Sequence, residues 1–192
     1  INPQELPEAG AGIERALIEA ALAGDGKAFG ALVQPHLPLL YRVASRVCRD
    51  AQLAEEAVQE TLAVAYRQLG KYEPGTSIKA HLAGIAVKRA HTLLRSEIRR
   101  GNREQASPPP SACAGAEELM SAAQQASRVR AVLAGMPEKR REAALLRLDA
   151  GLSFAEIART LDTTEGSARV LVHLALKELR EHLSELLESR GG

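Results

Sequence analysis

The stretch SFAEIARTLDTTEGSARVLVHLAL, Ser153 to Leu176, carries the signals for two short helices separated by a tight turn. Ser153 and Glu156 form an S-x-x-E capping box, which predicts that the first helix begins at Phe154. Residues spaced three or four positions apart give this helix one apolar face, made of Ile157, Ala158 and Leu161.

The second helix of the pair is expected to follow almost at once. Asp162 and Thr163 interrupt the apolar period, and Thr164 is a residue type that caps a helix. A break this short is typical of a helix-turn-helix, whose second helix lies in a DNA groove. Two ordinary core helices joined by a tight turn give the same pattern, so this segment alone leaves both interpretations open.

The composition of the whole chain favours a helical protein. The 192 residues are 45% hydrophobic and 26% charged, which is typical of one soluble globular domain or two small ones. Aromatic residues are only 3% and Trp is absent, so the core must consist mainly of Leu, Ala, Val and Ile. We find no strand with clear alternation and therefore predict an all-α fold.

The sequence gives no sign of a membrane or secretory protein. No apolar run approaches the length of a membrane span, and INPQELPEAG at the start is not a signal peptide. Cys48 and Cys113 lie far apart without metal-like spacing, and we interpret both as reduced thiols. We expect a cytoplasmic protein that does not insert into a membrane.

Upstream of the opening stretch, the periodicity predicts two groups of helices. The first group forms a domain over residues 13–100. Its predicted helices cover residues 13–22, Asp25 to Pro35, the continuation of that helical period up to Arg49, residues 51–69, and Ser77 to about Arg99. The helix over 51–69 is predicted to bury Leu53 or Ala54, Ala57, Val58, Thr61, Leu62, Ala65, Tyr66 and Leu69.

A segment without apolar period separates this domain from a second one. GNREQASPPPSACAGA, residues 101–116, has three consecutive prolines and is interpreted as a flexible, partly extended linker. The second domain, 117–188, is predicted to contain a helix over 117–134, a helix from Pro137 to Gly151, the helix-turn-helix at 153–173 and a final helix ending near Glu188. The helix after Pro137 has Ala143, Ala144, Leu146 and Leu148 as its apolar residues.

Charge changes sign along the first domain. Residues 55–60 hold three acids and no base, whereas residues 88–103 hold six bases and one acid. Either run is open to interpretation as a solvated helix face, but together they suggest one surface for a protein partner and one for phosphates. The net charge of only +1 indicates that, if DNA is bound, a partner supplies part of the affinity.

Sequence motifs for catalysis are absent. There is no phosphate-binding glycine loop, no H-E-x-x-H and no G-x-S-x-G, and the five histidines are scattered. We therefore predict that the protein is not an enzyme, needs no cofactor and has no metal site.

Three motifs in order resemble one family, the bacterial RNA polymerase sigma factors of the extracytoplasmic-function type. AEEAVQETLAVAYRQLGKYEP, Ala54 to Pro74, is similar to the family's polymerase-binding helix, with Glu56, Leu62 and Tyr66 in place of Asp, Phe and Trp. HLAGIAVKRAHTLLR, from His81, is similar to the promoter-melting segment, and MPEKRREAALLRLDAGLSFAEIA resembles the family's L-P-x-x-x-R and L-S-x-x-E-I-A pattern.

The resemblance implies an all-α protein whose two domains are sigma regions 2 and 4, and it implies partners. Core RNA polymerase would be bound at its β′ clamp helices and β flap, promoter DNA at the −10 and −35 elements, and an anti-sigma factor, often membrane-anchored in this family, would control the protein. The implied polymerase-binding residues are Glu55, Glu56, Gln59, Glu60 and Leu62. The implied −10 contacts are Tyr72, Lys79, His81, Lys88, Arg89, Arg95, Arg99 and Arg100. The implied −35 contacts are Thr164, Ser167, Arg169, Val170, His173 and Lys177.

This chain also departs from the family pattern. His81, Lys88 and Thr92 replace the usual Trp, Asn and Asp of the promoter-melting segment, which puts the capture of a flipped base in doubt. The recognition helix reads GSARVLVHLAL, so three arginines frequent in the family have become leucines. The arrangement of these substitutions is similar to the branch that serves cobalt and nickel resistance, which suggests a stress or metal-resistance operon.

A helical wheel separates the roles of those leucines. Leu171 falls on the core side, whereas Val170, Leu174 and Leu176 flank a polar stripe that contains Arg169. The three flanking residues can contact a thymine methyl, be covered by an anti-sigma factor, or pack on neighbouring helices.

Two rival functions stay open at this level. A stand-alone regulator that dimerises through its last helix would leave the acidic helix over 54–74 without a role. A sigma-like interaction protein that has lost DNA binding is suggested by the leucines of the recognition helix.

Overall fold

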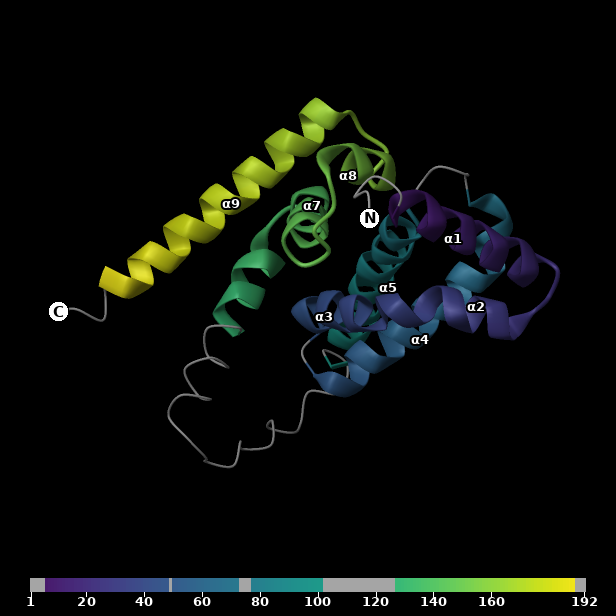
Figure 1. The fold of residues 1–192 in the computed structure, drawn as a ribbon. Helices are drawn as coiled ribbons and strands as arrows, with labels where there is room; N and C mark the ends of the chain where they lie inside the picture. The colour runs from purple at the N-terminus through teal and green to yellow at the C-terminus, as the bar shows by residue number, and fades with distance from the viewer. Residues whose placement is uncertain (1–5, 49, 73–76, 102–126, 189–192) are drawn as a thin grey trace.

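The computed structural model describes residues 6–48, 50–72, 77–101 and 127–188, and all regular structure within these ranges is helical. Figure 1 shows the order of the helices along the chain. They are α1 (Leu6–Leu22), α2 (Gly26–Val33), α3 (Leu37–Val47), α4 (Ala51–Gln68), α5 (Ile78–Gly101), a helical segment over 127–135, α7 (Glu138–Leu148), α8 (Phe154–Thr160) and α9 (Glu165–Glu188). Short 3₁₀ turns cover η1 (Gln34–His36) and η2 (Leu69–Lys71). The predicted all-α class is confirmed.

Polar side chains begin the helices where the sequence predicts. Asp25 accepts hydrogen bonds from the backbone N–H groups of Lys27 and Ala28, and Asp50 accepts one from Leu53. Both bonds of the Ser153–Glu156 capping box are present. Since each cap satisfies backbone donors that the first turn leaves unpaired, these residues fix where the helices start.

The ends of several helices differ from the prediction. α1 begins at Leu6, earlier than expected, and Pro35 produces the 3₁₀ turn η1 rather than a simple stop. Gly70 does not end α4, because η2 continues the chain to Lys71. Gly151 lies beyond the end of α7 and has φ +63°, a conformation that glycine adopts without steric cost.

Some of the residues predicted on apolar faces are exposed. Tyr66 is 43% exposed and packs edge-to-face on Phe29, with 5.0 Å between the ring centroids. Leu148, at the end of α7, is 53% exposed. A helical period predicts which side of a helix is apolar, but it does not show that a neighbouring helix covers that side along its whole length.

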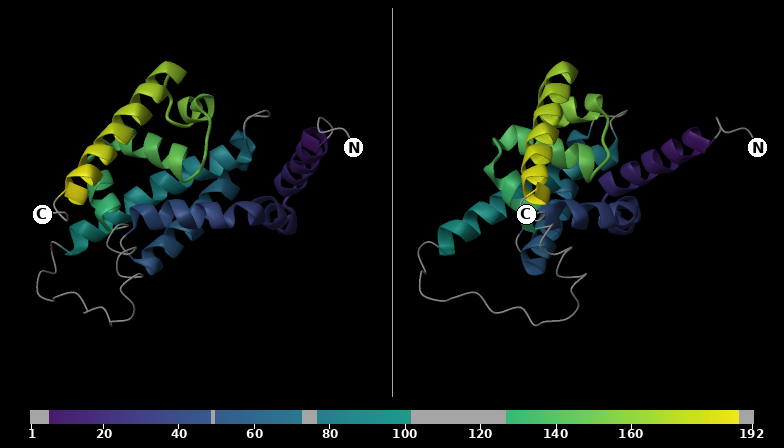
Figure 2. Two further views of the ribbon diagram at one scale, coloured as in Figure 1. Left: turned by 60° about the vertical axis from the view of Figure 1, so that its left-hand side comes forward. Right: turned by 90° about the vertical axis from the view of Figure 1, so that its left-hand side faces the viewer.

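The two groups of helices pack against each other. α1 to α5 form one bundle, in which α1 extends outward in the side views of Figure 2. α7, α8 and α9 form the other, and α7 and α8 contact α5 while α7 also contacts α3. Buried residues of both bundles join in one continuous apolar core. The predicted linker over 101–116 lies, apart from Gly101 at the end of α5, outside the described residues.

Candidate functional site

An exposed acidic face runs along α4. Glu55, Glu56 and Gln59 are exposed, and Glu60 is half-buried. The opposite side of the helix is buried through Ala54, Ala57, Val58 and Thr61, which holds the acidic side outward. Leu62 is half-buried against the core at the border of this face. The side chains predicted to bind polymerase therefore share one surface.

Some of the predicted −10 residues lie at the two ends of α5. Arg99 and Arg100 are exposed near the end of α5, where Arg100 pairs with Glu97. At the other end of α5, the rings of Tyr72 and His81 meet edge-to-face, with centroids 5.8 Å apart. The Tyr72 hydroxyl also donates a hydrogen bond of 3.1 Å to Glu14 of α1.

Most of the predicted −10 residues face the second bundle. His81, Lys88 and Arg89 line a cleft of about 670 Å³ whose opposite wall is formed by α8 and the turn after it, including Glu156, Arg159, Thr160, Asp162 and Thr163. Lys79 points toward the turn before α8, because its Nζ lies 3.8 Å from the position that a Cβ on Gly151 would take. Arg95 binds Glu138 of α7 at 3.2 Å.

The cleft exists because one glycine lets α8 approach α5. A Cβ built on Gly84 would lie 2.5 Å from Cγ2 of Thr160, closer than real Cβ contacts allow. Thr160 is fixed in turn, since its hydroxyl donates a 2.8 Å hydrogen bond to the carbonyl of Glu156. This close approach depends on the absence of a side chain at residue 84.

Polar contacts join the bundles at a second point. Arg46 of α3 forms a 3.1 Å ion pair with Asp149, which follows α7, and Arg42 donates to the backbone carbonyl of Asp149. Nearby, His91 of α5 lies against Glu142 of α7, with 3.7 Å between Nδ1 and the carboxylate, and both side chains are buried. Sequence reasoning singled out neither Asp149 nor the His91–Glu142 pair.

Burial sets the charge of two groups at the cleft. It lowers the pKa of His81, so this imidazole is neutral near pH 7. Burial alone would raise the pKa of Glu156, but its hydrogen bonds with Ser153 and the charges of Lys79 and Arg159 lower it overall. Glu156 is therefore an anion opposite the bases of α5.

The predicted recognition helix begins with an ordered turn. Asp162 adopts φ +49°, and the hydroxyl of Thr164 accepts a 3.1 Å hydrogen bond from the backbone N–H of Ser167. Arg169 binds Glu165 at 2.6 Å and stacks on Phe154, whose ring centroid lies 4.6 Å from the guanidinium carbon. Arg147 stacks on the same ring at 4.8 Å. The sequence alone did not reveal this role of Phe154. In the sequence, Phe154 is only an apolar residue at the start of a helix.

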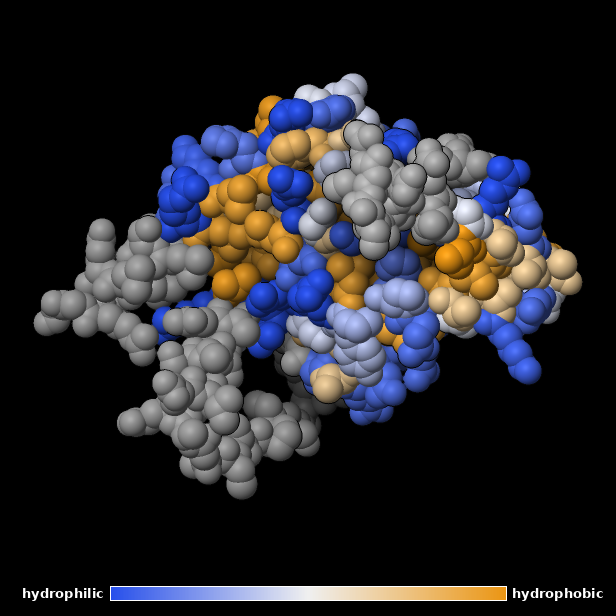
Figure 3. Space-filling model, in the orientation of Figure 1, coloured by the Kyte–Doolittle hydropathy of each residue, from blue (hydrophilic) through white to orange (hydrophobic). Residues whose placement is uncertain are grey.

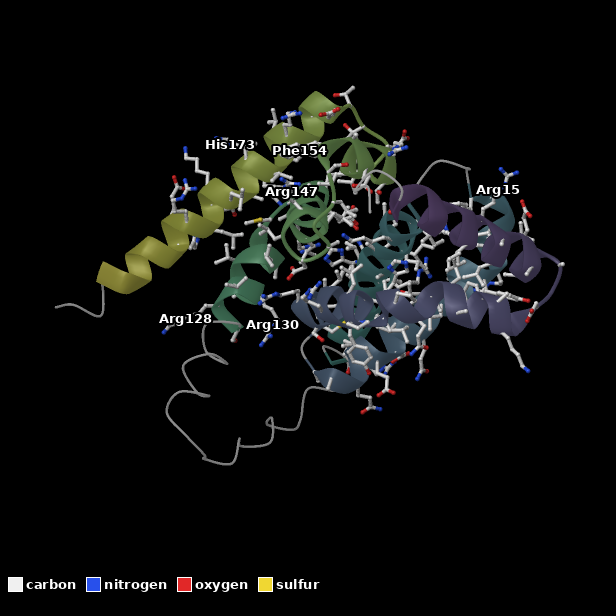
Figure 4. All side chains as sticks on the ribbon, in the orientation of Figure 1. Arg15, Arg128, Arg130, Arg147, Phe154 and His173 are labelled. Carbon is white, nitrogen blue, oxygen red and sulfur yellow. The ribbon has the colours of Figure 1, made fainter. Side chains whose placement is uncertain are left out.

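The outer face of α9 is partly polar and partly apolar. His173 and Lys177 are exposed, and Figure 4 shows His173 on the side of α9 away from Arg147 and Phe154. Val170 is 57% exposed and Leu174 is 37% exposed, whereas Leu176 is half-buried against the core. Hydrophobic side chains gather over the middle of α9 in Figure 3. Exposed Leu148 is a further apolar residue of this bundle.

Comparisons with known protein families match both bundles. Residues 32–100 match the family model described as Sigma-70 region 2. Residues 126–179 match the model described as Sigma-70, region 4.

Known proteins with similar sequences cover most of the chain. RNA polymerase sigma factor CarQ of Myxococcus xanthus is 31% identical over 172 residues, which are 85% of this chain and 93% of CarQ. ECF RNA polymerase sigma factor SigD of Mycobacterium tuberculosis is 30% identical over 179 residues, 88% of this chain and 82% of SigD.

Solved structures share the fold. CnrH in complex with the cytosolic domain of CnrY matches with a TM-score of 0.67 and 22% identity, covering 92% of this chain and 98% of CnrH. The sigma factor RpoE, solved with the anti-sigma factor NepR from Bartonella quintana, matches with a TM-score of 0.61 and 23% identity, over 82% of this chain and 98% of RpoE. In the described part of the chain, no helix combines the length and apolar character needed to cross a membrane.

Proposed function

The chain belongs to the ECF RNA polymerase sigma factors, and on that premise we propose how its surfaces direct core polymerase to specific promoters. The observation that carries the proposal is the exposed acidic face of α4, Glu55, Glu56 and Gln59 with half-buried Glu60, set beside the basic residues of α5. An acidic face suits a basic partner protein, and a basic helix suits phosphates. Sigma factors are non-catalytic initiation factors, which agrees with a chain that has no enzymatic activity of its own.

We assign each surface to one partner. The acidic face of α4 binds the β′ clamp helices of core polymerase in the cytoplasm, and the second bundle reaches the β flap. The α5 residues from Lys79 to Arg100 contact the −10 element. Arg169, His173 and Lys177 of α9 enter the major groove of the −35 element, where we expect Arg169 to make a bidentate contact to guanine.

The compact arrangement must open before promoter DNA is bound. His81, Lys88 and Arg89 face α8 across a cleft, so α8 lies where the backbone of a DNA strand bound by these residues would have to pass. Binding to core polymerase separates the two elements, because the −10 and −35 elements lie on different turns of the promoter and the two bundles must each reach one.

An anti-sigma factor is the partner that we assign to the apolar residues of the second bundle. Val170 and Leu174 of α9 and Leu148 of α7 are exposed, and exposed apolar groups favour a protein contact. The control of a metal-resistance operon, and a membrane anchor on the inhibitor, stay predictions from the sequence.

Run-off transcription with core polymerase tests the function. We expect transcripts from a cognate upstream region only when the full chain is added. A folded protein that binds core polymerase but gives no transcript from any such region would favour the sigma-like interaction protein. The exposed side chains of Val170 and Leu174 on the predicted recognition helix also agree with that alternative. Binding to a two-fold operator without polymerase would favour the stand-alone regulator.

A charge reversal tests the docking face. Glu56→Lys should weaken core polymerase binding at least several-fold, because it places a cation where the proposed surface needs an anion, while the exposed site leaves the melting temperature nearly unchanged. Affinity is measured by fluorescence anisotropy of labelled protein. Glu19→Lys, an exposed charge reversal on α1, is the matched control and should bind as the unaltered chain does. Equal affinity for Glu56→Lys would remove α4 from the interface.

A further inference from the structure

Three potential metal ligands meet where the two bundles touch. One ring nitrogen of His91 on α5 and one carboxylate oxygen each of Glu138 and Glu142 on α7 all lie within 4.8 Å of one another. The two glutamates are four residues apart, so they project from the same side of α7. The histidine and the glutamates are 47 and 51 residues apart in the chain, and only the packing of the bundles brings them together.

The buried histidine lacks the partners that a structural histidine normally has. His91 is 2% exposed, and neither Nδ1 nor Nε2 forms a hydrogen bond within the described part of the chain. Buried polar atoms are nearly always satisfied, because an unpaired one has lost its hydrogen bonds to water without gaining any in return. His91 therefore points into the cluster with its bonding capacity unused.

The spacing fits a shared ion better than a direct hydrogen bond. Nδ1 of His91 and Oε1 of Glu142 are 3.7 Å apart, beyond the usual length of about 2.7–3.2 Å for such a bond. Two ligands on one tetrahedral metal, with bonds of about 2.1 Å, are separated by about 3.4 Å. Glu138 is exposed and lies at the open side, where an ion can enter and water can complete the coordination.

We propose that His91, Glu138 and Glu142 bind a divalent transition-metal ion of the zinc class, and that this ion clasps the two bundles together. One imidazole nitrogen and two carboxylate oxygens form a borderline donor set that suits Zn²⁺ better than Ca²⁺ or Mg²⁺. The metal links α5 to α7, so it stabilises the compact arrangement. The consequence for transcription rests on the proposed function, whereas binding of the metal does not.

The cations around the cluster set its affinity. Arg95 pairs with Glu138 at 3.2 Å, but both side chains are about half exposed and Arg95 can turn to solvent. Arg141 interacts electrostatically with both glutamates, while burial lowers its own pKa. The positive charge of Arg141 repels a metal ion, so we expect this cluster to bind metal more weakly than a structural zinc site does. Removing that charge should therefore tighten binding.

Isothermal titration calorimetry of the full chain with Zn²⁺ tests the site. The Cys113→Ser background removes one competing thiol, and Cys48 is a weak competitor because it is buried and burial raises its pKa to about 12. We expect one Zn²⁺ per chain and no heat with Ca²⁺ or Mg²⁺. His91→Gln should weaken Zn²⁺ binding by about tenfold or more, Glu138→Gln should weaken it several-fold, and Arg141→Gln should tighten it.

Controls decide whether the binding is that of the proposed cluster. His182→Gln, an exposed histidine of α9, should leave the titration unchanged. Circular dichroism checks folding, and if His91→Gln fails to fold, exposed Glu138→Gln still tests the ligand set. Equal affinity in the unaltered chain and Glu138→Gln, or no Zn²⁺ bound at all, overturns the proposal. A pH-dependent stability that disappears in His91→Gln without any metal binding would assign the pair to a shared proton instead.

The clasp has a second readout. Zn²⁺ should slow limited proteolysis at the boundary between the bundles and reduce run-off transcription by the unaltered chain, but not by Glu138→Gln. If no promoter is found, the proposed function fails while calorimetry and proteolysis still judge the metal site. A Zn²⁺ titration that binds at the cluster without slowing this cleavage overturns the clasp.

Discussion

At the scale of single residues, the recognition helix depends on how Arg169 is held. Glu165 binds its guanidinium at 2.6 Å, and Phe154 lies beneath it at 4.6 Å. Both contacts restrict the rotamers of a long side chain before DNA arrives, so less conformational entropy is lost when a base contact forms. Phe154 is thus a positioning residue for the base contact that we assign to Arg169.

Replacing the aromatic ring tests this positioning. Phe154→Leu keeps an apolar residue but removes the cation–π contact, which is worth about 0.5–1 kcal/mol at an exposed site. We expect discrimination between cognate and altered −35 sequences to fall by up to that amount, with core polymerase binding unchanged. Arg169→Ala should lose about 1–3 kcal/mol of the same discrimination. If both variants lose affinity equally on all sequences, Arg169 contacts phosphate only.

The neutral state of His81 predicts a pH dependence of stability. Burial lowers the pKa of His81, and it also lowers that of His36, where Glu14 acts in the opposite sense and Lys79 in the same sense. Below about pH 6.5 an unfolded histidine takes up a proton that the folded state resists, so stability falls as the pH drops through this range. Urea unfolding at about pH 7.5 and about pH 5.5 should show a smaller loss in His81→Gln than in the unaltered chain. An identical loss would place the titration elsewhere.

At the scale of elements, the contact between α5 and α8 depends on Gly84. In an isolated first bundle, Gly84→Ala should stabilise α5 by about 0.5–1 kcal/mol, because alanine is the better helix former. In the full chain the added Cβ meets Thr160, and such overpacking typically costs about 1–3 kcal/mol. Gly84→Ala should therefore loosen the compact arrangement.

Limited proteolysis at the boundary between the bundles measures this loosening. Cleavage of the full chain should be faster for Gly84→Ala than for the unaltered chain. Gly30→Ala, a helical glycine of α2 whose Cβ would meet nothing within 4 Å, is the matched control and should not change the cleavage rate. Equal cleavage rates for all three proteins would mean that α8 shifts to accommodate the added Cβ without a loss of stability.

Local signals predicted the helices, but not the surface between the bundles. Asp25, Asp50 and the Ser153–Glu156 box fix helix starts through bonds to their own neighbours, so a short window of sequence contains the whole cause. His91 and Glu142 meet only because two helices distant in the chain pack together. Gly84 inside a helical pattern is a local signal of the contact between α5 and α8, because a glycine in a helix often marks a close approach of another segment.

At the scale of the whole molecule, two bundles that we propose to act apart are held together in the free chain. Arg46 and Asp149, Gly84 and Thr160, and His91 and Glu142 join them at separate points. Lys88 and Arg89 of α5 line the cleft against α8, whereas Arg99 and Arg100 near the end of the same helix are exposed. We therefore expect promoter recognition by this sigma factor to include a rearrangement of its own domains.

The distance between the bundles tests this account most directly. Donor and acceptor dyes on Arg67→Cys of α4 and His182→Cys of α9, both exposed positions, report that distance by energy transfer in the Cys113→Ser background. We expect high transfer in the free chain and a clear decrease when core polymerase and promoter DNA form a complex that makes run-off transcripts. Unchanged transfer in such an active complex would contradict it, because the compact arrangement would then be the one that reads the promoter.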